Sequence, residues 1–276
     1  MKIPEPKEYS LGYDPVKNKN NSGGFMKRIL VFSPATVIGV TIFSYFASQF
    51  LAVILISIGA QALGKNSEEA IRSLESSVSM QFLAIVLIEL GTLFIVWLYL
   101  MVIKKPLKDV GVVKKVKGIH LGYGVIAFII YFIFLTMVMA LISKLVPAIN
   151  LDQSQEVGFE SATSGGALIM TFVSLAILPP IAEEIVFRGF LYSGLRTKLK
   201  PIMAGLIVSL IFASAHLQLG SGNPPLWVAA IDTFILSLFL VYLREKTGSI
   251  WAGVVVHFLK NSMAFLFLFV LKTSGM

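Results

Sequence analysis

The sequence predicts an all-α, polytopic transmembrane helical bundle of about seven spans, with six to eight possible. Its 276 residues are 56% hydrophobic and only 14% charged, and the mean hydropathy is +0.83. A soluble domain carries about 25% charged residues, so a soluble fold would leave too much apolar surface unburied. The apolar residues also form runs of about 20 or more, which is the length of a helix that crosses a bilayer core.

The apolar runs place the elements in order. The first run is long enough to tilt, bend or hold a re-entrant piece, and a bend, if present, could come from Pro34 or Gly39. The segment 1–28 is expected to be a flexible cytoplasmic tail without a cleavable signal peptide, and 29–276 the transmembrane domain. The expected spans are 29–62, 80–103, 119–143, 167–192, 201–219, 226–243 and 249–271.

The charges in the loops predict the orientation. Basic residues precede the first span and occupy alternate loops after it, whereas the opposite loops are acidic. The positive-inside rule therefore predicts a multi-pass protein of the cell membrane with a cytoplasmic N-terminus. The net charge of +8 fits topology and attraction to membrane lipids, not nucleic acid. The basic set is Lys2, Lys7, Lys17, Lys19, Lys27, Arg28, Lys104, Lys105, Lys108, Lys114, Lys115, Lys117, Arg196, Lys198, Lys200, Arg244 and Lys246; the opposite loops hold Lys65, Arg72, Glu68, Glu69, Asp152, Glu156 and Glu160.

Polar residues inside the spans are the candidates for function. The chain has no cysteine, which excludes disulfides, thiolate metal sites and a cysteine nucleophile. A charge at mid-bilayer costs a few kcal/mol or more, so such residues usually face a cavity and are functional. The candidates are Glu89, Glu183, Glu184, Arg188, His216, Asp232, His257, Lys260 and Asn261. Of these, Glu89, Asp232 and Lys260 are more typical of structural pairing.

Two adjacent glutamates and an arginine form the most informative motif. Glu184 and Arg188 are four residues apart, so they share one face of a helix and can pair. Glu183 is turned by about 100° from its neighbour and has no local partner. A buried carboxylate without a partner can act as a general base. We therefore expect Glu184 and Arg188 to have a structural role and Glu183 to be the catalytic residue. The alternative is one structural ion-pair network containing both acids.

Two later segments supply histidines. His216 follows Phe212 by four residues, and taken alone it is more typical of an interfacial histidine bonded to backbone. His257 and Asn261 are also four residues apart, so they present two hydrogen-bonding groups to one side of a helix. Such a pair either belongs to a site or joins neighbouring helices.

Together these segments resemble the CAAX protease and bacteriocin-processing family (CPBP, or Abi) of intramembrane peptidases. The family motifs are two glutamates followed by an arginine, a phenylalanine four before a histidine, and a histidine four before an asparagine. They match Glu183, Glu184 and Arg188, then Phe212 and His216, then His257 and Asn261. The resemblance covers roughly 167–265, the expected catalytic core, and Leu243–Trp251 resembles the family's lead-in to the third motif.

The resemblance implies peptide-bond hydrolysis in a membrane-embedded cavity open toward the cytoplasm. The first glutamate, with the histidine of the second motif, would activate a water. The histidine and asparagine of the third motif would donate hydrogen bonds to the developing oxyanion. The second glutamate and the arginine would orient these groups. The implied site residues are therefore Glu183, Glu184, Arg188, His216, His257 and Asn261, and the implied substrate is a membrane-associated peptide or protein.

A metal-dependent version of this hydrolysis is the alternative mechanism. The chain has no HExxH run, the usual helical zinc signature. Glu183, His216 and His257 would be the ligands of a catalytic zinc, which needs three ligands and a water. Asn261 is an unusual zinc ligand but a good oxyanion donor, so we expect the metal-free reaction and no cofactor.

Two other function classes use the same residues. A proton-coupled transporter would use the intramembrane acids and histidines as a relay, although the chain shows no internal repeat of the kind many transporters have. A non-enzymatic membrane protein, such as a bacteriocin-immunity protein, would retain the fold without catalysis. We expect the peptidase.

Overall fold

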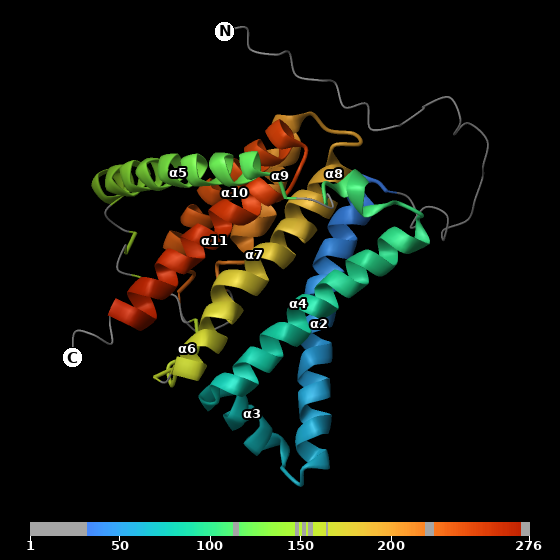
Figure 1. Ribbon diagram of the computed structural model, residues 1–276, viewed down its shortest axis with the longest axis vertical. Helices are drawn as coiled ribbons and strands as arrows, with labels where there is room; N and C mark the ends of the chain where they lie inside the picture. Colours follow the sequence, from blue (N-terminus) through green and yellow to red (C-terminus); the bar gives the residue numbers. More distant parts are fainter. Residues whose placement is uncertain are drawn as a thin grey trace, which may run out of the picture.

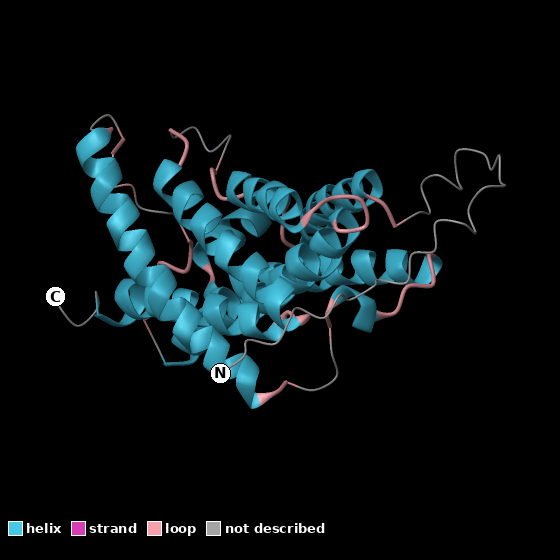
Figure 2. Ribbon diagram, turned by 90° about the horizontal axis from the view of Figure 1, so that it is seen from above, coloured by secondary structure: helices cyan, strands magenta, loops and turns pink. Residues whose placement is uncertain are grey.

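The computed structural model shows a helical protein (Figures 1 and 2). It describes residues 32–112, 116–146, 149–150, 153, 157–163, 165–218 and 224–271, and every regular element in these ranges is a helix. The predicted tail 1–28 lies outside the described residues, as do Lys114, Lys115, Asp152 and Glu156 among the loop charges.

Within the described residues, six helices are long and apolar enough to cross a membrane. They are α2 (Pro34–Ala62), α4 (Val78–Val102), α5 (Gly118–Leu145), the continuous helix Gly165–Leu195, α10 (Trp227–Thr247) and the continuous helix Trp251–Leu271. A seventh apolar helix, α9 (Pro201–Ser214), is shorter. The predicted fold class, an all-α polytopic bundle of about seven spans, is confirmed.

Two of the long helices are composite. The first comprises α6 (Gly165–Phe172), η3 (Val173–Ile177), α7 (Leu178–Glu183), η4 (Glu184–Leu191) and α8 (Tyr192–Leu195). The last comprises α11 (Trp251–Phe265) and η5 (Leu266–Leu271). The segments η3, η4 and η5 are π-helical, whereas the short connecting helices are α3 (Ser67–Ser76) and a 3₁₀ turn, η2 (Leu107–Val110). The apolar runs predict neither connecting helix.

The structure decides one alternative left open for the first span and corrects the end of the fifth. Pro34 does not bend the first span, because it is the first residue of α2, where the missing N–H has no cost; Gly39 lies inside the same continuous helix. The fifth span does not reach residue 219. The helix α9 ends at Ser214, so it covers about 21 Å at 1.5 Å per residue, less than a bilayer core of about 30 Å. His216 therefore lies in a turn after α9 and not at the far end of a span.

The helices carry apolar side chains outward and small polar ones inward. On α2, Phe46 and Phe50 are 65% and 71% exposed, whereas Ser44 and Ser48 are buried. Ser48 packs against Gly91 of α4, where an added Cβ would lie 3.2 Å from the serine Cβ. Small residues at such contacts let membrane helices approach closely, and the exposed apolar face suits lipid.

The loops gather into two groups at opposite ends of the bundle. At one end, the Ile250 N–H donates to the Gly111 carbonyl at 3.2 Å, and Arg196 pairs with Glu245 at 3.0 Å. At the other, the Ser161 hydroxyl donates to the Ser76 carbonyl at 2.8 Å, which joins α3 to the segment before α6 (Figure 1). The basic loops after α4, α8 and α10 share the first end.

Among the described residues, two of the three apolar clusters lie on either side of the middle and end of the composite helix Gly165–Leu195. One joins α2, α4, α9 and the end of the composite helix around Phe190 and Val208. The other joins α5, α10 and α11 around Tyr131 and Leu240. The middle of the composite helix, α7, contacts both α4 and α11. The three motifs therefore meet between the two clusters.

Candidate active site

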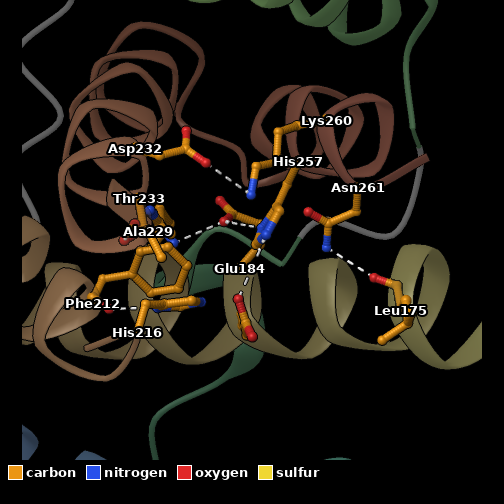
Figure 3. A network of polar contacts seen from close by, with 12 residues as sticks. Leu175, Glu184, Phe212, His216, Ala229, Asp232, Thr233, His257, Lys260 and Asn261 are labelled. Atoms are coloured by element: carbon orange, nitrogen blue, oxygen red, sulfur yellow. Dashed lines mark hydrogen bonds and ion pairs between the residues drawn. The ribbon is translucent and has the colours of Figure 1, made fainter. Parts of the chain in front are cut away.

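Two consecutive prolines shape the helix that carries the glutamates. In an α-helix the Leu175 carbonyl would accept from the N–H of residue 179, but Pro179 has no N–H. The π-helix η3 directly precedes this point, and α7 begins with proline in its first turn. The Asn261 side-chain Nδ2 donates to the Leu175 carbonyl at 2.9 Å (Figure 3). The Leu175 carbonyl, which Pro179 leaves without a backbone donor, therefore bonds α11 to the helix that carries Glu183.

The second glutamate and the arginine form the predicted ion pair. Arg188 Nη1 lies 2.9 Å from Glu184 Oε1, and both side chains are fully buried. The guanidinium also lies over the Phe212 ring, 4.4 Å from its centroid, which is a favourable cation–π contact. Gly253 of α11 leaves room for the carboxylate, because a Cβ there would lie 2.5 Å from Glu184 Oε2.

A further arginine supports this pair from α10. Arg244 Nε donates to the Arg188 carbonyl at 3.2 Å, and its Nη2 donates to the Ser193 hydroxyl at 3.2 Å. The Arg188 carbonyl lies within the π-helix η4 (Glu184–Leu191). The sequence places Arg244 in a basic loop and in the segment that resembles the family's lead-in to the third motif, but it does not indicate this contact.

His257 lies between the two glutamates. Its Nε2 is 3.6 Å from Glu183 Oε2, and its Nδ1 is 3.5 Å from Glu184 Oε1. The histidine is 3% exposed, the Glu184 side chain is fully buried, and the Glu183 side chain is 24% exposed. Glu183 has no ion pair on its own helix within the described residues, as the spacing predicts, but it has this partner on α11.

His216 reaches the same region from the turn after α9. Its Nδ1 is 2.8 Å from the Phe212 carbonyl. A carbonyl only accepts, so Nδ1 carries the proton and Nε2 of the neutral ring keeps its lone pair. The Phe212 ring contacts both histidines: it lies 4.8 Å from the His216 ring at a tilt of 54°, and 5.9 Å from the His257 ring in an edge-to-face arrangement. His216 is therefore bonded to the backbone and is also a neighbour of His257, which lies against both glutamates.

The six predicted site residues differ in how closely they converge. Glu183, Glu184, Arg188 and His257 are in direct contact, and His216 joins them through Phe212. Figure 3 shows His257 and Asn261 projecting from α11 above the helix that carries Glu184 and Leu175. Asn261 uses one amide N–H on Leu175, and its other N–H is left for another acceptor.

The residues of the zinc alternative do not form a ligand group. Among the described residues, no three or more His, Asp or Glu side chains are placed to hold a metal ion. Of the set Glu183, His216 and His257, the described ion pairs join only Glu183 and His257. We therefore derive no step through a metal.

Four residues near the site receive little weight in the sequence analysis. Lys260 Nζ lies 3.2 Å from Asp232 Oδ2, and the Tyr131 hydroxyl donates to Asp232 Oδ1. Glu89 of α4 is close enough to Glu183 for the two carboxylates to interact electrostatically. The three charged residues are detectable as charges inside apolar runs. Tyr131 is not, because a tyrosine in an apolar helix carries no such signal.

The fold and site define a multi-pass helical membrane protein with acids, histidines and an arginine buried between its helices. Residues 165–263, which contain all three motifs, match the family model described as Rce1-like, type II CAAX prenyl endopeptidase Rce1-like. The predicted resemblance is confirmed for this segment.

Two curated proteins match over a similar length. A Bacillus subtilis (strain 168) protein named "Putative membrane peptidase YdiL" is 34% identical over 94 residues, which cover 34% of this chain and 35% of that protein. An Escherichia coli protein named "Uncharacterized 24.3 kDa protein" is 28% identical over 102 residues, which cover 36% of this chain and 45% of that protein. No solved structure matches the chain. The matched segment spans less than half of either relative, so the activity of the whole protein is a proposal.

Proposed function

We propose that this protein is an intramembrane endopeptidase that hydrolyses peptide bonds of membrane-associated peptides or proteins. The observation that carries the proposal is the placement of His257 against both Glu183 and Glu184, inside the segment that matches a family of endopeptidases. The proposed setting is the cell membrane, with a cytoplasmic N-terminus, membrane lipids as neighbours and no nucleic acid partner.

Glu183 is the proposed general base. Glu184 is fully buried and paired with Arg188, so its carboxylate is neither accessible nor free. The Glu183 side chain is 24% exposed, and its ion-pair partner among the described residues is the histidine His257. A water can therefore reach this carboxylate. It would take a proton as the water attacks the scissile carbonyl and pass that proton to the leaving amine. A positioned base of this kind contributes about 10²–10⁴ in rate.

The histidines and the asparagine complete the proposed mechanism. His216 keeps the Nε2 lone pair, because its Nδ1–H is used on backbone, and so it can accept from the same water. His257 and the remaining amide N–H of Asn261 are the proposed donors to the oxyanion. Each such donor is worth about 10²–10³ in kcat in other hydrolases. No cofactor is proposed.

The test is cleavage by the purified full-length protein in detergent, with a membrane-anchored peptide library as substrate and mass spectrometry of the products. We expect Glu183→Gln to lose at least about 100-fold in rate, because the amide cannot accept the proton. Glu160→Gln, an exposed change on the loop before α6, is the matched control. Equal activity of wild type and Glu183→Gln overturns the proposal.

Two further arms address the alternatives. Cleavage activity is expected to survive a strong chelator. If the chelator abolishes the activity and added zinc restores it, the zinc-dependent mechanism replaces the metal-free one. Proton-driven flux in proteoliposomes that persists in Glu183→Gln, without any peptide cleavage, would support the transporter instead. The orientation is tested by labelling single cysteines, which the native chain lacks, at Lys105 and at Glu69 from outside intact cells.

A further inference from the structure

A polar network joins three helices beside the proposed site. Tyr131 comes from α5, Asp232 from α10 and Lys260 from α11. The tyrosine hydroxyl donates to Asp232 Oδ1. Lys260 Nζ lies 3.2 Å from Asp232 Oδ2, and Figure 3 shows these two side chains facing each other. Each carboxylate oxygen therefore has its own partner, and the carboxylate holds the ammonium from a fixed position.

The network is built into the apolar interior of the three helices. Tyr131 is 1% exposed and packs in the apolar cluster with Leu236 and Leu240, so its hydroxyl has little freedom. The Asp232 and Lys260 side chains are 20% and 22% exposed. Charged residues inside membrane helices are costly and usually functional.

Lys260 is close to the catalytic groups. It follows His257 by three residues, so the two share a face of α11. It is near enough to Glu183, His216 and His257 for its positive charge to act electrostatically on all three. The ammonium thus lies within electrostatic reach of the proposed base, although among the described residues its ion pair is with Asp232.

The two glutamates differ in whether another cation already pairs with them. Glu184 is already neutralised by Arg188 at 2.9 Å. Glu183 has only His257 within ion-pair distance among the described residues, at 3.6 Å. A lysine side chain is a flexible four-carbon arm that moves to the nearest anion. Without Asp232, Glu183 is a carboxylate within electrostatic reach of the ammonium that no lysine or arginine already pairs with among the described residues.

We propose that Asp232 and Tyr131 are positioning residues that hold the Lys260 ammonium away from Glu183. An ion pair between Lys260 and Glu183 would occupy the carboxylate oxygens that must accept the proton of the attacking water. This inference rests on the proposed function, because it concerns the availability of the general base. A purely structural role, in which Asp232 only joins helices, predicts a different response to removal of Lys260.

The kinetic test compares Asp232→Asn, Lys260→Met and the double variant in the cleavage assay. Asp232→Asn is expected to lower kcat about tenfold with little change in KM, a coupling typical of contacting residues. The double variant is expected to recover to the rate of Lys260→Met, because no ammonium is left to block the base. Asp232→Glu keeps the carboxylate and should retain activity, and Tyr131→Phe should show a smaller loss than Asp232→Asn.

A thermodynamic readout tests the inference independently of hydrolysis. Double-mutant cycles of Glu183→Gln and Lys260→Met are measured by thermal unfolding in detergent, in the wild-type and Asp232→Asn backgrounds. A coupling between the two residues is expected to be larger in the Asp232→Asn background, where the new ion pair forms. Equal coupling in both backgrounds overturns the inference, even if wild type cleaves no peptide.

The kinetic arm has its own overturning result. If Asp232→Asn and the double variant are equally inactive while their melting temperatures match the wild type, Asp232 acts directly and not through Lys260. Full activity of Asp232→Asn also overturns the inference. Failure of wild type to cleave any substrate, with the coupling present in the Asp232→Asn background only, counts against the proposed function and supports the inference.

Discussion

Two ion pairs lie beside the same histidine and differ in how they are held. Glu184 and Arg188 are four residues apart on one helix and fully buried. Asp232 and Lys260 come from different helices, and each side chain is about a fifth exposed, at 20% and 22%. The first pair is fixed by the helix itself, whereas the second depends on the packing of α10 against α11. We call Glu184–Arg188 the closed pair and Asp232–Lys260 the open pair. The closed pair is suited to a structural role, and the open pair is suited to adjusting a neighbouring charge.

The largest effect is expected from breaking the closed pair. Arg188→Met should destabilise the protein by about 3–5 kcal/mol, because Glu184 is left as an uncompensated buried charge. Thermal unfolding in detergent measures the loss. Lys260→Met is the matched control, since it leaves Asp232 bonded to Tyr131 and partly exposed. Equal losses in the two variants would remove the distinction between the pairs.

A smaller effect is expected from moving the closed pair without removing a charge. Gly253→Ala places a Cβ 2.5 Å from Glu184 Oε2, so the carboxylate or α11 must shift. We expect about 1–3 kcal/mol of destabilisation, as for other overpacked sites, and a lower cleavage rate. Gly39→Ala in α2 is the control, because its Cβ would meet nothing within 4 Å. A Gly253→Ala variant as stable and active as Gly39→Ala would show that the carboxylate position is not restricted.

The smallest effect is expected from an exposed pair. Arg196 and Glu245 lie 3.0 Å apart, with side chains 26% and 41% exposed. Glu245→Gln should cost less than about 1 kcal/mol, because solvent screens such pairs and the amide can still accept from Tyr192. The same unfolding assay at low and high salt measures it. A loss comparable to that of Arg188→Met would mean that exposure does not rank the ion pairs of this protein.

The sequence predicts features that depend on one helix at a time. Apolar runs locate the spans because hydrocarbon thickness sets helix length, and the four-residue spacing places Glu184 beside Arg188. The same reasoning correctly expects no local partner for Glu183. The sequence does not predict the early end of α9 at Ser214, because no proline or glycine follows until Gly220.

Contacts between helices are outside the reach of local periodicity. The Asn261 bond to Leu175 requires knowledge of which helix packs against α7. The place of His257 between two acids depends on the same packing. Tyr131 looks like any other large side chain of α5 until Asp232 is opposite its hydroxyl. These residues are found only when the helices are assembled.

The carbonyl that Pro179 leaves open has a consequence for the order of assembly. Hydrocarbon offers no water to such a group, so the helix remains incompletely satisfied until Asn261 arrives on α11. The same helix brings His257, which lies far downstream of the glutamates in the chain. Packing of α11 against the glutamate helix therefore gives the Leu175 carbonyl its hydrogen bond and places His257 beside the glutamates in the same step. A nascent chain that has inserted only the glutamate helix holds the acids without their imidazole partner, so the proposed hydrolysis would begin only when the bundle is complete.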